Sequence, residues 1–108
     1  MGSIQRKFVN WEKTGRHLQL LREDNLELRR FVCSALKHDK SDCSTDCETC
    51  RFEMDNHISR KELSDVFGVT ENIIFNWENG RTEIGYEDLL FYAQLTKLKI
   101  EDIVIFMD

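Results

Sequence analysis

The chain of 108 residues contains no proline and only five glycines, so few positions force the backbone to turn. No apolar run approaches the roughly 20 residues that a membrane-spanning helix needs, and we expect no membrane segment. Residues 1–7 (MGSIQRK) also lack the apolar stretch of a secretory signal peptide. These absences predict a cytoplasmic protein.

Motifs that identify common enzymes are missing as well. The sequence has neither a glycine-rich phosphate-binding loop nor a His-Glu-x-x-His motif. It also offers no plausible triad of nucleophile, base and acid. We therefore expect a protein that is not an enzyme.

Charge is unevenly distributed along the chain, whose formal net charge is −5. Residues 1–50 contain nine Lys and Arg against eight Asp and Glu, whereas residues 51–108 contain six against twelve. Neutralisation of phosphates by Lys and Arg supplies most non-specific affinity for DNA. A DNA-binding face in the second half must therefore gather its basic side chains locally.

In the first half, apolar residues recur mostly at three- and four-residue steps between Glu12 and Lys37, which is the period of an α-helix. They are Leu18, Leu21, Leu28, Phe31, Val32, Ala35 and Leu36. We predict two helices in this stretch, with a break near Asn25-Leu26.

Helix signals return after Ile58. Ser59 and Glu62 have the spacing of a capping box, in which each side chain accepts a hydrogen bond from the backbone N–H of the other residue. Gly68 is expected to end this helix in the left-handed conformation that glycine tolerates. Thr70 can cap the next helix.

That next helix is predicted to end at Asn79-Gly80, and two more are predicted at residues 86–95 and about 100–106. The β-branched residues at 103–106 also fit a short strand, which is the alternative for the last element. Together these elements predict an all-α fold.

A different composition separates the two helical regions. Residues 38–57 are polar and almost free of aliphatic side chains, which predicts a loop. A structureless loop of about twenty residues is unusual in a compact domain and calls for another source of order. Three of the four cysteines fall in this loop, and the fourth lies shortly before it. They are Cys33, Cys43, Cys47 and Cys50.

Clustered cysteines in a chain without an export signal favour a metal site over disulfides. Four thiols are the number that a tetrahedral zinc site needs, and Cys47-x2-Cys50 has the short spacing that lets two thiolates meet at one ion. His38 and His57 are alternative ligands. Two other interpretations remain open, namely an iron–sulfur cluster and a thiol redox switch.

The segment Arg60–Arg81 (RKELSDVFGVTENIIFNWENGR) resembles the lambda-repressor-like, XRE-type family of helix-turn-helix transcriptional regulators. The family's motifs appear here as Glu62-Leu63, Gly68-Val69-Thr70 and Trp77-Glu78-Asn79-Gly80. Leu89–Ala93 and Ile100–Ile103 resemble the family's last two helices, and residues 14–24 resemble its first.

The resemblance implies a single five-helix domain over residues 1–108. Its core would consist of residues 14–24 and 58–105. A cysteine-bearing insertion at about 26–57 would separate the first helix from the second, which in the family follow one another closely. This insertion is the main departure from the family's pattern.

Double-stranded DNA is the partner that the resemblance implies, with a homodimer on a palindromic site as the expected arrangement. The positions that carry over as DNA contacts are Arg60, Thr70, Glu71, Asn72, Phe75, Asn76, Arg81 and Thr82. Of these, Arg60, Arg81 and Thr82 would contact backbone phosphates.

Four of the others would reach base edges from the recognition helix, namely Glu71, Asn72, Phe75 and Asn76. Asn72 or Asn76 would pair with adenine, and Glu71 would accept a hydrogen bond from cytosine. Phe75 would pack on a thymine methyl group. Trp77, by contrast, is expected in the core.

A second function fits the same residues. The predicted recognition helix carries two Glu and no Lys or Arg, and it lies in the acidic half of the chain. A helix-turn-helix fold can serve protein contacts alone, because fold does not determine function. The alternative is therefore a protein-interaction adaptor or inhibitor, with an exposed Phe75 as its anchor.

Overall fold

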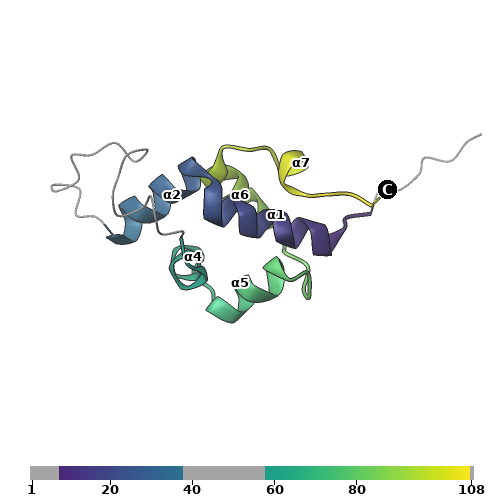
Figure 1. Ribbon diagram of the computed structural model, residues 1–108, viewed down its shortest axis with the longest axis horizontal. Coiled ribbons are helices and arrows are strands. Elements are labelled where there is room, and N and C mark those ends of the chain that lie inside the picture. The colour runs from purple at the N-terminus through teal and green to yellow at the C-terminus, as the bar shows by residue number, and fades with distance from the viewer. Residues whose placement is uncertain (1–7, 38–57, 108) are drawn as a thin grey trace, which may run out of the picture.

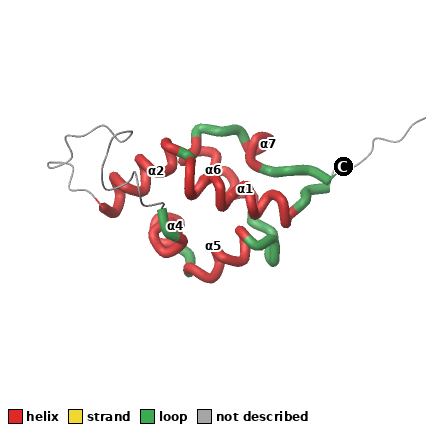
Figure 2. Tube along the Cα trace, viewed as in Figure 1, coloured by secondary structure: helices red, strands yellow, loops and turns green. Residues whose placement is uncertain are grey.

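Seven helical elements make up the described part of the computed structural model, which covers residues 8–37 and 58–107. They are α1 (Trp11–Asp24), α2 (Leu26–Val32), the π-helical turn η1 (Cys33–Lys37), α4 (Arg60–Phe67), α5 (Glu71–Glu78), α6 (Tyr86–Thr96) and α7 (Ile100–Ile103) (Figure 1). Within these ranges no regular strand occurs, and the predicted all-α class is confirmed (Figure 2).

Asn25 separates α1 from α2 and satisfies the backbone of both. Its N–H donates to the carbonyl of Leu21 at 3.0 Å. Its side-chain oxygen accepts from the N–H of Leu28 at 2.9 Å and so caps α2. The break predicted near Asn25-Leu26 is confirmed.

The two helices of the helix-turn-helix unit begin and end at the capping residues that the sequence predicts. The Ser59 hydroxyl accepts from the N–H of Glu62 at 3.0 Å, and the Glu62 carboxylate accepts from the N–H of Ser59 at 2.9 Å. Gly68 ends α4 with φ +72°, a conformation that side chains rarely adopt. The hydroxyl of Thr70 then accepts from the N–H of Ile73 and begins α5.

α1 is the central element of the core. It packs against α2, α5 and α7, while α4 packs against α5 and α2 against α6. Figure 1 shows α1 along the long axis of the molecule, with α4 and α5 on one side and α7 on the other. The largest fully buried side chains come from all these helices and from Ile58; they include Leu18, Leu28, Leu63, Ile74, Tyr92 and Ile103.

Two glycines allow α1 and α5 to approach backbone to backbone. A Cβ atom on Gly15 would lie 2.5 Å from the carbonyl oxygen of Glu78 and 2.6 Å from that of Trp77. A Cβ on Gly80 would lie 2.7 Å from the Cα of Glu12. The two helices therefore touch through main-chain atoms at both of these points.

The predicted last helix is too long. α7 ends at Ile103 instead of Phe106, and the chain continues extended. Phe106 forms an isolated antiparallel bridge with Val9, and the N–H of Asn10 donates to Ile105 O at 2.7 Å. The β-branched residues at this end thus favour extended backbone over another helical turn. The alternative of a strand over residues 103–106 is not observed either, because Ile103 ends α7 and only an isolated bridge forms at Phe106.

None of the helices in the described residues is both long enough and apolar enough to cross a membrane.

Replacing Gly15 by alanine tests the close contact between α1 and α5. The added methyl group meets fixed main-chain atoms, so the helices must separate, and we expect the free energy of unfolding to fall by about 1–3 kcal/mol. Urea denaturation followed by circular dichroism measures the change.

Gly85→Ala is the matched control, because the nearest atom to its added Cβ is 4.0 Å away. It should cost less than about 1 kcal/mol, from the weaker preference for alanine as N-cap of α6. Equal stability of the Gly15→Ala variant and the unmodified protein would contradict the close approach.

Candidate nucleic-acid interface

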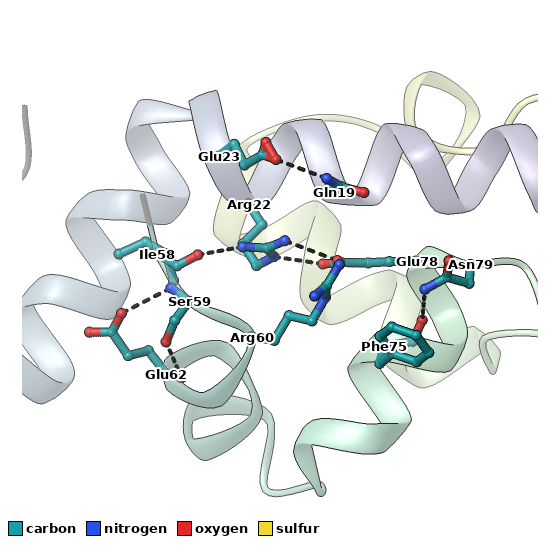
Figure 3. Close-up of polar contacts among 10 residues, drawn as sticks. All are labelled: Gln19, Arg22, Glu23, Ile58, Ser59, Arg60, Glu62, Phe75, Glu78 and Asn79. Carbon is teal, nitrogen blue, oxygen red and sulfur yellow. Dashed lines mark hydrogen bonds and ion pairs between the residues drawn. The ribbon is translucent and has the colours of Figure 1, made fainter. Parts of the chain in front are cut away.

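A buried ion pair lies where α1, α5 and the start of the helix-turn-helix meet. The guanidinium group of Arg22 on α1 binds the carboxylate of Glu78 on α5 through two hydrogen bonds. Nε donates to Oε2 at 2.7 Å, and Nη2 donates to Oε1 at 3.0 Å. Its Nη1 donates to the carbonyl of Ile58 at 2.7 Å (Figure 3). The Glu78 side chain has no exposed surface, and that of Arg22 is 9% exposed.

A second arginine reaches the same carboxylate from α4. Arg60 Nε donates to Glu78 Oε1 at 2.8 Å, as Figure 3 shows. Two guanidinium groups therefore share one carboxylate. Because Glu78 is buried and doubly paired, it contributes no negative charge to the outer face of α5.

Tyr92 of α6 packs close to this pair, with its ring centroid 6.4 Å from that of Trp77. Burial is the main cause that raises the pKa of its phenol well above the usual value, and the negative charge of Glu78 raises it further. Trp77 itself is buried, as expected for a core residue.

Phe75 lies beneath two arginines. The guanidinium carbon of Arg60 is 5.2 Å from the centroid of the Phe75 ring, and that of Arg81 is 5.5 Å from it. Both distances fall within the range of cation–π interaction. Phe75 is consequently half-buried, not the freely exposed residue that the sequence predicts for a protein anchor.

The outer face of α5 brings several predicted contact residues together. Glu71 and Asn72 are exposed and Asn76 is half-buried. Arg60, Glu71, Asn72 and Phe75 line a shallow depression of about 340 Å³. The N-terminal end of α5 thus presents amide and carboxylate groups beside a guanidinium.

The other predicted contacts lie at the two ends of α5. Thr70 is exposed at the N-terminal end, where its hydroxyl oxygen caps the helix. Arg81 and Thr82 are exposed directly after the C-terminal end. Ile73, also on α5, is 37% exposed.

Arg22 and Glu78 form the structural ion pair beneath this site that the sequence does not predict. Glu78 was noted only as part of a motif and as an unfavourable charge. The available signal was an arginine placed next to Leu21 on the apolar face of α1, but nothing in the sequence connects it to a carboxylate 56 positions away. Such long-range partners become visible only when the helices are packed.

The four cysteines fall mostly outside the described residues. Cys33 begins η1 and is 4% exposed. Cys43, Cys47 and Cys50 lie outside the described ranges, as do the alternative ligands His38 and His57. Among residues 8–37 and 58–107 there is no group of three metal-binding side chains.

Comparison with known proteins adds to this geometry. A helix-turn-helix family model matches residues 54–103. The matched family is the XRE-type helix-turn-helix family, to which residues 54–103 are similar. The match covers α4 to α7 and leaves out α1, which packs directly on α5. No curated protein and no solved structure matches the chain.

Members of the matched family are DNA-binding regulators, so the match supports a function of this general kind. In such domains the second helix of the unit enters the major groove with its N-terminal residues on base edges. Here that helix is α5, and its N-terminal residues border the depression beside Arg60.

Removing the shared carboxylate tests the ion pair. Glu78→Ala leaves the buried guanidinium of Arg22 without its charged partner, and we expect the free energy of unfolding to fall by about 3–5 kcal/mol. Chemical denaturation monitored by tryptophan fluorescence gives this value directly.

Glu83→Ala removes an exposed carboxylate close in sequence and should change stability by less than about 0.5 kcal/mol. If the two variants were equally stable, the ion pair would not hold the helices together.

Proposed function

We propose that this chain is a transcriptional regulator that recognises a specific duplex DNA sequence through α5. The observation that carries the proposal is the outer face of α5. Amide and carboxylate groups stand at its N-terminal end, and two arginines lie near the ring of Phe75. This arrangement combines groups that can read bases with groups that can bind phosphates.

Base recognition falls to three side chains in this proposal. Asn72 and Asn76 each carry a donor and an acceptor, which suits bidentate pairing with adenine. Glu71 accepts a hydrogen bond from the amino group of cytosine. Arg81 and Thr82 bind phosphate after the helix ends, and Thr70 binds it at the N-terminal end of α5. Arg60 binds phosphate from the start of α4.

The acidic character of the second half is less unfavourable on this face than the sequence suggests. Of the two glutamates on α5, only Glu71 is exposed, because Glu78 is buried between two arginines. Arg60 and Arg81 then outweigh the single remaining carboxylate. This local balance supports phosphate binding by a chain whose net charge is −5.

A protein-interaction adaptor is the second candidate. The observation that favours it is the exposed Ile73 on α5, since an apolar side chain on that helix suits a protein partner. Selection on DNA separates the two functions, because an adaptor recovers no preferred sequence.

Selection of purified protein on a randomised duplex library should enrich one sequence. Recovery of an inverted repeat would support the homodimer, whereas a single half-site would indicate a monomer. Failure to enrich any sequence at low salt would overturn the proposed function.

Asn76→Ala should then weaken binding to the selected site by about 1–3 kcal/mol and relax preference at one base pair. Fluorescence anisotropy with the selected duplex and with variants at each position measures both effects. Gln94→Ala, an exposed change on α6, is the control and should bind as the unmodified protein does. An Asn76→Ala variant with full affinity and unchanged preference would remove Asn76 from the set of base contacts.

We also propose that the four cysteines bind one structural zinc ion, an inference that rests on their number and spacing. One observation makes such a site useful to the domain. Cys33 directly follows α2, whose Leu28 and Val32 lie in the core, so an ion held there attaches the cysteine-bearing segment to packed structure. Zinc would contribute folding free energy there without taking part in any reaction.

Elemental analysis of untagged protein should find one zinc per chain, with no visible absorbance. Cys47→Ser combined with Cys50→Ser should abolish zinc binding, while Ser44→Ala, in the same segment, should retain it. Stoichiometric iron with visible absorbance would indicate a cluster, and metal-free protein with reversible disulfides would indicate a redox switch. Either result would overturn the zinc site.

A further inference from the structure

The ring of Phe75 receives two guanidinium groups that come from different parts of the chain. Arg60 stands at the first position of α4, 5.2 Å from the ring centroid, and Arg81 follows α5, 5.5 Å from it. α5 itself, with the sequence ENIIFNWE, has no basic residue. The Phe75 ring therefore has two arginine side chains beside it, although α5 contains no basic residue of its own.

We propose that Phe75 is a positioning residue that holds Arg60 and Arg81 for contact with the DNA backbone, and that it is not a reader of bases. This inference rests on the proposed function. It means that the side chains around Phe75 bind backbone phosphate. The contact between Phe75 and a thymine methyl group, which the family resemblance implies, is then not made. Phe75 acts through Arg60 and Arg81, whose guanidinium groups both lie near its ring.

Arg60 is held on two sides. Glu78 accepts its Nε–H at 2.8 Å, and the Phe75 ring packs against its guanidinium. The side chain is still 32% exposed, so its remaining donors can meet a phosphate. A guanidinium fixed in this way loses little conformational freedom when it binds DNA.

Arg81 depends more strongly on the ring. It is exposed and lies just beyond the end of α5, and its own N–H donates to the carbonyl of Asn76 at 2.9 Å. The backbone is thereby fixed, whereas a long arginine side chain at an exposed position retains many rotamers. Stacking on Phe75 restricts these rotamers before DNA arrives.

The occupied ring argues against a base contact. A thymine methyl group packs on an apolar surface. The Phe75 ring already has two cations near it, so a thymine would have to compete with them. The two roles predict different losses: a base reader affects one base pair, whereas a residue that positions phosphate-binding arginines affects all sequences alike.

Phe75→Leu keeps an apolar side chain but removes the ring. We expect affinity for the selected site and for unrelated duplexes to fall by the same factor, about five- to thirtyfold. The slope of log affinity against log salt should decrease by about one to two, as phosphate contacts are lost. Phe75→Tyr keeps the ring and should stay close to the affinity of the unmodified protein.

A double-mutant cycle with Arg81→Gln tests whether Phe75 acts through Arg81. In the Arg81→Gln background, Phe75→Leu should cost clearly less than it does alone, because one of its two partners is already gone. Nuclear magnetic resonance supplies a readout without DNA: ring-current shifts of the Arg60 and Arg81 side-chain protons should be present in the unmodified protein and absent from Phe75→Leu.

Two results would overturn the role of Phe75. One is a Phe75→Leu variant that loses preference at a single base pair while its affinity for unrelated duplexes is unchanged. The other is an additive cycle with Arg81→Gln. If the unmodified protein enriches no sequence and binds no duplex, the proposed function itself fails, so the two failures are distinguishable.

Discussion

The carboxylate of Glu78 is the group on which the arrangement of helices depends. It is fully buried, and it binds Arg22 of α1 and Arg60 of α4 from its own place on α5. A charge removed from water is tolerated only when its partners are close and well oriented. Three helices must therefore meet in one relative position, and the contact at Gly15 shows how closely α1 approaches α5 there.

The same interaction shapes the outer surface. Because Glu78 is turned inward, the exposed face of α5 carries one carboxylate, Glu71, and is flanked by two arginines. Arg60 takes part in both arrangements, since its Nε binds the buried carboxylate and its guanidinium stacks on Phe75. The side chain of Arg60 thus contacts both the buried ion pair and the proposed binding face. A substitution that moves Glu78 is therefore expected to move the guanidinium beside Phe75 as well.

The parts that the sequence predicts correctly are those whose causes are local. The capping box of Ser59 and Glu62, the left-handed Gly68 and the break at Asn25 each depend on neighbours within a few residues. The predicted end of the last helix is wrong because Phe106 pairs with Val9, which lies at the opposite end of the described chain. Arg22 and Glu78 were missed for the same reason, and so was the placement of Arg81 on Phe75, which needs the turn after α5.

The described residues before and after positions 38–57 belong to the same network. Before these positions lies η1, which begins at the buried Cys33 and extends α2 on the core. After them comes Ile58, whose side chain is fully buried and whose carbonyl accepts a hydrogen bond from Arg22. Arg60 follows two residues later and binds the same carboxylate as Arg22. Ile58 and Arg60, the first described residues after the cysteine-bearing stretch of sequence together with Ser59, are therefore both held by the hydrogen bonds around Arg22 and Glu78.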